Sequence, residues 1–187
     1  MLGVLDLFMI LLWVAAIVWG LYRHTVGILI SWGGFYLVII LAGLLDLMVS
    51  GAHSFGMKVV MALWGTAQSI RLLEVILFSV VSGGGFVIYH LILHFAREGE
   101  SYPEFGFIDG LLGGVLGALL GLVLAALLGN LWRLAVSVPW QPYHLQQSML
   151  ANYQASLLAP RLQGVLRIFN KTLLPFFFYQ HPPVFFR

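Results

Sequence analysis

The sequence predicts an all-α, polytopic membrane protein, and three observations lead to this fold class. Hydrophobic residues make up 61% of the 187 residues and charged residues only 9%, whereas a soluble domain has about 25% charged residues. So little charge cannot cover a surface that faces water, and the mean hydropathy of +0.98 agrees with this. Several long segments also contain no Asp, Glu, Lys or Arg. Lipid is therefore expected to surround most of the protein.

The same composition excludes several classes of function. The net charge of +2 and the absence of any basic run argue against a nucleic-acid partner. The absence of cysteine excludes disulfides, thiolate catalysis and Cys-ligated metals. No Lys or Arg precedes the first hydrophobic run, which is unlike a secretory signal peptide. The first segment is therefore expected to remain as a helix.

Four segments meet or approach the length that a membrane crossing requires. A hydrocarbon core of about 30 Å needs about 20 apolar residues in a helix. The predicted spans are about 2–22, 25–46, 72–96 and 108–132, which together form a transmembrane domain over residues 1–133. Only Arg23 and His24 separate the first two spans, so these two are expected to form a tight antiparallel hairpin.

The segments that connect or follow the spans are more polar. Residues 46–74 carry Met and Trp at helical spacing, which predicts a helix in the membrane interface, with a short re-entrant segment as the alternative. Residues 97–109 are predicted to be a solvent loop. Residues 134–187 are predicted to be interfacial, with two short amphipathic helices broken at Pro160. The Phe- and Pro-rich tail 175–187 suits the lipid interface or a partner surface.

Glycines form the clearest packing motif. Gly113, Gly117 and Gly121 lie four residues apart and so share one helix face, which lets another helix approach closely. The complete predicted packing set is Gly110, Gly113, Gly114, Gly117 and Gly121. Packing within the same bundle is the favoured interpretation, and a homodimer or subunit interface is the alternative. The run 82–85, Ser-Gly-Gly-Gly, favours close helix packing or a gentle kink, and a discontinuous helix around an ion or substrate site is the alternative.

The charges in or beside the spans are predicted to share one membrane face, because tracing the chain through four crossings brings them together. They are Asp6, Asp46, Arg71, Glu74 and Arg133. Pairing lowers the cost of placing a charge in the membrane. At least one of the three acids is therefore expected within reach of Arg71 or Arg133. A proton or ion relay is the alternative interpretation.

Two histidines are the weak candidates for ligand binding. His90 and His94 lie four residues apart, a spacing that can ligate a metal, and either one can ligate a tetrapyrrole. Only His24 offers a third ligand, so histidines with nothing bound are favoured, and no metal or cofactor is expected. Ser148 and Ser156 lack an Asp–His pair to activate them, and no catalytic residue is predicted.

Several stretches form a recognisable combination: Leu5-Asp6-Leu7, the turn at 20–31, the glycine helix at 108–117, Trp140, Gln147-Ser148 and the segment 156–160. Together they resemble the colicin V production protein family of bacterial inner-membrane proteins. The chain departs from the family at His24, where a Gly is usual, and at Gly27, where a basic residue is usual. The resemblance implies a role in toxin production or export and in envelope function.

These observations predict an inner-membrane scaffold or accessory subunit that acts by helix packing, with membrane lipid and other membrane subunits or a second copy as partners. A small transporter or channel with an intramembrane acidic layer is the first alternative. An accessory subunit of a photosynthetic or respiratory complex is the second. Of the nine Lys and Arg residues, seven fall on one side of the predicted topology. By the positive-inside rule this favours cytoplasmic N- and C-termini.

Overall fold

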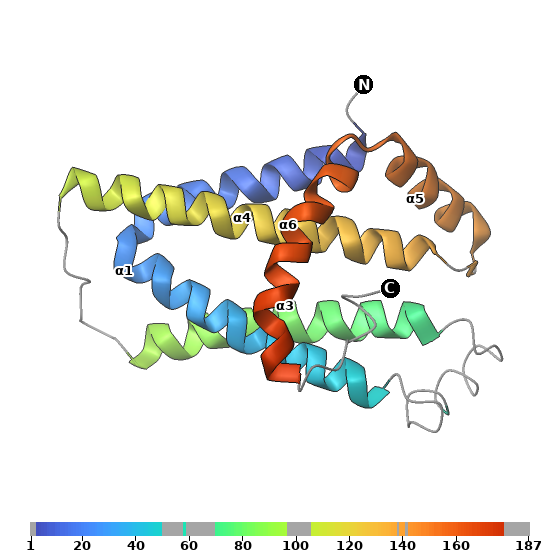
Figure 1. Cartoon of the computed structure of the whole chain (residues 1–187), viewed down its shortest axis with the longest axis horizontal. Helices are drawn as coiled ribbons and strands as arrows, with labels where there is room; N and C mark the ends of the chain where they lie inside the picture. Colours follow the sequence, from blue (N-terminus) through green and yellow to red (C-terminus); the bar gives the residue numbers. More distant parts are fainter. Residues whose placement is uncertain are drawn as a thin grey trace.

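The computed structural model describes residues 3–49, 58, 70–96, 106–137, 139–140 and 142–177, without the side chains of residues 49, 70 and 71. Within these ranges the chain is all-helical (Figure 1). The helices are α1 (Val4–Val49), α3 (Ile70–Ala96), α4 (Phe107–Val136), α5 (Tyr143–Ala155), α6 (Leu158–Leu173) and the 3₁₀ helix η2 (Leu174–Phe177).

Helix α1 is bent back on itself at His24. The backbone there has φ 57° and ψ −178°, which is not helical, and it divides α1 into two limbs, 4–23 and 25–49. Both limbs extend from the kink toward the same side of the molecule, so the chain runs in opposite directions along them (Figure 1). The 46-residue helix therefore has the form of a hairpin without a loop.

Three described helices are long and apolar enough to cross a membrane: α1, α3 and α4. This makes the chain a multi-pass membrane protein. The predicted spans end close to the helix ends, but α4 continues to Val136, beyond the predicted end at 132. The first two predicted spans lie in the single helix α1, one in each limb.

The helix ends gather on two sides of the molecule. The kink of α1, the C-terminal end of α3 and the N-terminal end of α4 lie at one side, here called the kink end (left in Figure 1). Both ends of α1, the start of α3 and the end of α4 lie at the opposite side, the far end.

Helix α4 forms the centre of the bundle. It contacts both limbs of α1, α3, α5 and α6, and half of its most apolar stretch is buried. Leu120, Leu127 and Leu134 are among its core residues. The outward faces of α1 and α3 carry many exposed Leu, Val, Ile and Phe side chains, as expected of helices that face lipid.

Helix α6 crosses the bundle at a steep angle (red in Figure 1) and packs on α4 and on the second limb of α1. It buries Leu166, Phe169 and Leu173 against them, and Phe177 of η2 completes this part of the core. Phe177, which belongs to the predicted tail 175–187, is buried in the protein's own core, since the residue is 1% exposed.

The break between α5 and α6 lies at Ser156 and Leu157, earlier than the predicted break at Pro160. Pro160 instead occupies the first turn of α6, where a missing backbone N–H is tolerated because that donor has no intrahelical partner. Helix α5 has no buried residue, so its apolar residues do not extend the buried face of α6.

Two further predictions can be compared with the helices. The run Ser82–Gly85 does not interrupt α3, which is a continuous helix over 27 residues, so a discontinuous helix is excluded there. The interfacial helix predicted within 46–74 falls largely outside the described residues, as do most of the loop 97–109 and the tail from 178.

Candidate functional site

The glycine face of α4 lies against the first limb of α1 in the same chain. A methyl group at Gly117 would collide with the carbonyl oxygen of Ala16, and one at Gly113 with that of Gly20. A Cβ at Gly121 would lie 2.8 Å from the Trp13 ring. Backbone therefore meets backbone over about two helical turns, which is the type of contact that holds helices together in lipid. Gly114 accommodates the Leu21 side chain, and Gly110 lies at the edge of this interface.

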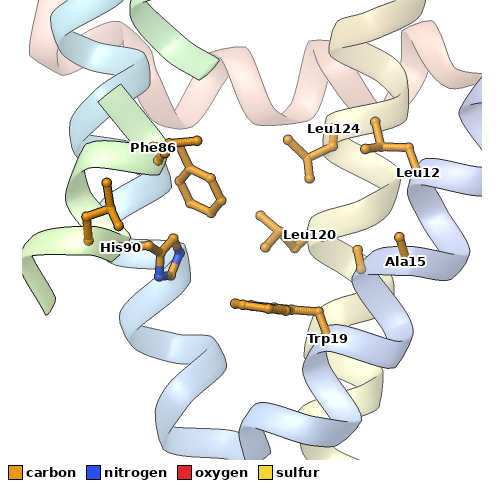
Figure 2. A pocket seen from close by; sticks show the side chains of 10 residues that line it. Leu12, Ala15, Trp19, Phe86, His90, Leu120 and Leu124 are labelled. Carbon is orange, nitrogen blue, oxygen red and sulfur yellow. The ribbon is translucent and has the colours of Figure 1, made fainter. Parts of the chain in front are cut away.

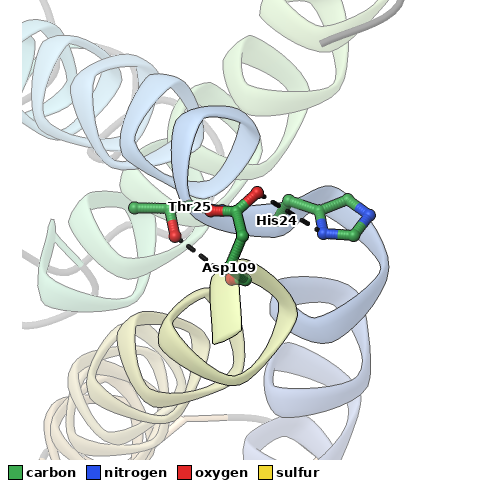
Figure 3. A network of polar contacts seen from close by, with 3 residues as sticks. All are labelled: His24, Thr25 and Asp109. Atoms are coloured by element: carbon green, nitrogen blue, oxygen red, sulfur yellow. Dashed lines mark hydrogen bonds and ion pairs between the residues drawn. The ribbon is translucent and has the colours of Figure 1, made fainter. Parts of the chain in front are cut away.

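A buried acid braces the kink of α1 (Figure 3). Asp109, which is 4% exposed, accepts a hydrogen bond of 3.1 Å from the backbone N–H of Thr25. The Thr25 hydroxyl donates to the Asp109 carbonyl at 3.1 Å, and His24 Nδ1 lies 3.6 Å from the second carboxylate oxygen. Asp109 thus lies at the N-terminal ends of both α4 and the second limb of α1, where a negative charge is favourable.

A second buried acid joins the far end of α1 to α6. Asp6 is fully buried and accepts a 2.5 Å hydrogen bond from the Ser156 hydroxyl. The backbone N–H groups of Leu157 and Leu158 donate to it at 3.0 and 3.1 Å. Ser156 Oγ in turn accepts from the N–H of Ala159. Asp6 and Ser156 together therefore cap α6, and Ser156 has a structural role here rather than that of a nucleophile.

The remaining charges of the predicted layer lie at the far end of their helices. Asp46 and Glu74 are 3% and 5% exposed, and each of them has an interaction partner. Arg133 donates to the side chain of Asn130 at 3.0 Å. The side chain of Arg71 lies outside the described residues, so the pairing of an acid with Arg71 or Arg133 stays a prediction.

An apolar crevice of about 450 Å³ opens between the first limb of α1 and α3, with α4 as its floor (Figure 2). Leu12, Ala15, Phe86, Leu120 and Leu124 are among its lining residues. Its volume lies within the range of small-molecule sites, roughly 300–1,000 Å³.

One end of the crevice is polar. The ring of His90 lies 5.9 Å from that of Trp19, and the two side chains face each other across the gap (Figure 2). Both imidazole nitrogens of His90 are buried and have no hydrogen-bond partner among the described residues. The guanidinium of Arg23 lies 4.8 Å from the Trp19 ring centroid. His94, in contrast, is exposed one turn further along α3, so the two histidines do not share a site.

The outer face of α6 carries a set of exposed cations. Arg161, Arg167 and Lys171 all point away from the bundle, and α6 contains no acidic residue. We call these three residues the α6 cationic face. The C-terminal end of this face is held by Thr172, which shares a hydrogen bond of 2.9 Å with Tyr36 in the second limb of α1.

Several residues of these sites were not predicted from the sequence. Asp109 had been placed where the predicted loop 97–109 meets the predicted span 108–132 and was given no role, although an acid in the first turn of an apolar helix is a recognisable pattern. Trp19 and Arg23 had no assigned role. No group of three His, Cys, Asp or Glu side chains capable of holding a metal occurs among the described residues.

Comparison with known proteins gives no family assignment. No protein-family model, curated protein or solved structure matches the chain. The resemblance noted above therefore depends on the quoted residues alone.

Proposed function

We propose that the protein is a non-catalytic scaffold or accessory subunit of the bacterial inner membrane that binds a partner membrane protein through the α6 cationic face. The supporting observation is the depth of this face in the bundle. At a rise of 1.5 Å per residue, Tyr36 lies about 18 Å from the kink of α1 and about 20 Å from the other end of its limb.

Tyr36 therefore lies near the middle of its limb, and α6 ends beside it. If each limb of α1 crosses the membrane, Lys171 lies next to the hydrocarbon core with its side chain pointing outward. A charge near mid-membrane costs about 2.5–3.5 kcal/mol on insertion scales. Lipid is thus a poor neighbour for this face, whereas an acidic side chain of a second membrane protein neutralises the charge.

The buried acids support a role without chemistry of its own. Asp6 and Asp109 are held by helix N-termini and hydroxyl groups, in arrangements that position helices. His24 lies 3.6 Å from Asp109, but the Thr25 hydroxyl donates to the backbone carbonyl of Asp109 and not to His24, so these three residues do not have the geometry of general-base catalysis. The described polar groups of the spans thus fix the scaffold that presents α6.

The resemblance to the colicin V production protein family supports the same proposal. The usual residue of that family at position 24 is Gly, and His24 has a φ of 57°, a conformation that glycine adopts readily. On this basis we propose four crossings, two of them in α1, and a role in toxin production or export and envelope function.

Co-purification with charge-reversed variants tests the proposal. Wild-type protein is cross-linked in intact cells, purified in mild detergent and compared with Arg167→Glu/Lys171→Glu. The partner should be recovered with the wild type and lost with the double variant. It should be regained when an acidic residue of the partner at the cross-linked position is changed to Lys. Equal recovery with both proteins would contradict docking at α6.

A small transporter or channel is the second candidate, because a cationic face at this depth can also border a water-filled path. Reconstitution into liposomes separates the two. The scaffold proposal predicts no ion conductance by the purified chain, and conductance that is abolished by Lys171→Glu would favour the channel.

A further inference from the structure

The crevice between the first limb of α1 and α3 has the form of a binding site for an amphipathic molecule. Its apolar part is lined by Leu12, Phe86, Leu120 and Leu124. Its openings are lined by half-exposed side chains such as Val87 and Leu91, 59% and 50% exposed. These residues lie on faces that lipid can reach, so a ligand can enter from the side of the bundle.

The polar end of the crevice contains hydrogen-bond donors, and a positive charge lies beside it. His90 has two buried ring nitrogens without a partner among the described residues, at least one of which carries a proton. The indole N–H groups of Trp13, Trp32, Trp132 and Trp140 all donate to backbone carbonyls. No such bond is formed by Trp19 within the described part of the chain.

Arg23 adds the charge, since its guanidinium lies against the Trp19 ring at 4.8 Å. No acidic residue lines the crevice. Trp19 and Arg23 precede the α1 kink at His24, and the apolar residues lie further from it. The polar end therefore faces the kink end of the bundle, and the apolar part extends toward its middle.

We propose that this crevice binds one acyl chain of an anionic phospholipid, with its phosphate at Arg23, Trp19 and His90. A phosphate offers several strong acceptor oxygens to these donors and a negative charge to the guanidinium. The acyl chain covers the apolar walls. The membrane supplies such a lipid at the polar end of the crevice, which is also where its head group would lie.

Native mass spectrometry of the full chain in detergent tests the site, with phosphatidylglycerol and phosphatidylcholine of identical acyl chains as probes. One phosphatidylglycerol should remain bound per chain, in preference to phosphatidylcholine. Arg23→Gln should reduce this preference about fivefold, the effect of about one Lys or Arg near an anionic head group. Arg161→Gln removes a cation from α6 and should leave the preference for phosphatidylglycerol unchanged.

Two further variants separate binding from folding. Ala15→Phe fills the crevice from its exposed α1 side and should abolish retention, whereas Val18→Phe adds bulk outside the lining and should not. His90→Phe should weaken phosphatidylglycerol binding without lowering the melting temperature of the lipid-free protein, because the His90 imidazole forms no hydrogen bond among the described residues that the substitution would remove.

Equal retention of both phospholipids, or unchanged binding by Ala15→Phe, would overturn the proposal. Retention of oleate without retention of phosphatidylglycerol would overturn the assignment to a phospholipid.

Discussion

The carboxylate of Asp6 and the hydroxyl of Ser156 lie 2.5 Å apart, although 150 residues separate them in the chain. This contact joins the first turn of α1 to the start of α6. The same carboxylate also accepts from the backbone N–H groups of Leu157 and Leu158, so one buried charge satisfies two donors at the N-terminal end of α6. The position of the α6 cationic face therefore depends on Asp6.

Asp6→Ala is expected to destabilise the protein by about 2–4 kcal/mol, because it leaves the donors of α6 buried without an acceptor. Ser156→Ala should cost about 0.5–2 kcal/mol, as the loss of a helix cap does. Thermal unfolding in detergent measures both. Ser148→Ala, at an exposed position of α5, is the matched control and should have little effect.

A double variant tests whether Asp6 and Ser156 act together. The effects of residues in direct contact are not additive. Asp6→Ala/Ser156→Ala should therefore lose less stability than the sum of the single losses. Strict additivity would show that the two side chains act independently.

The helices themselves could be predicted from the sequence because long apolar segments have few alternatives in lipid. The near absence of charge determined the membrane class, and the spacing of Gly113, Gly117 and Gly121 identified a tightly packed helix face. The partner of that face required the structure, because glycine spacing does not state which helix approaches it.

The polar contacts were harder to predict, for a physical reason. Basic side chains were the expected partners for the acids of the spans. Asp6 and Asp109 are instead bound by backbone N–H groups at the N-terminal ends of other helical segments, α6 and the second limb of α1, and local spacing does not reveal which segment supplies these donors. The pairing of Asp6 with Ser156 also spans nearly the whole chain, so no local pattern reveals it.

His24 provides a test of backbone strain at the kink. A φ of 57° with an extended ψ is unfavourable for a residue with a Cβ, whereas glycine adopts it readily. His24→Gly is therefore expected to raise the stability by about 1 kcal/mol. His24→Ala retains the strain and loses the contact with Asp109, so it should be no more stable than the wild type. The melting temperature is predicted to be highest with Gly at position 24, lower with His and lowest with Ala. A Gly variant less stable than the wild type would contradict this prediction.

The orientation in the membrane can be tested directly because the chain contains no cysteine. The positive-inside rule predicts cytoplasmic termini and a periplasmic kink end. Phe107→Cys, at an 82% exposed position at the kink end, should react with an impermeant maleimide in intact cells. Ser148→Cys, on the exposed helix α5, should react only after lysis. The reverse pattern would show the opposite orientation.

The contact between α4 and the first limb of α1 gives the strongest stability prediction. Gly117→Leu inserts a side chain where the backbone of Ala16 lies, and close backbone approach is the source of attraction between helices in lipid. The helices must separate, so the melting temperature in detergent should fall sharply. The oligomer mass should not change, because the contact lies within one chain.

Two controls isolate the effect of the glycine contact in Gly117→Leu. Gly33→Leu places the same side chain at a helix position where a Cβ would have no atom of the described residues within 4 Å other than the adjoining helix backbone. Leu119→Ala removes a leucine side chain from a residue that is 50% exposed. Leu120→Ala is unsuitable as a control, because Leu120 is 2% exposed and its truncation alone should cost about 2–5 kcal/mol. If Gly117→Leu were as stable as Gly33→Leu, the glycine contact would not hold α4 against α1. A fall in oligomer mass would instead place the contact between two chains.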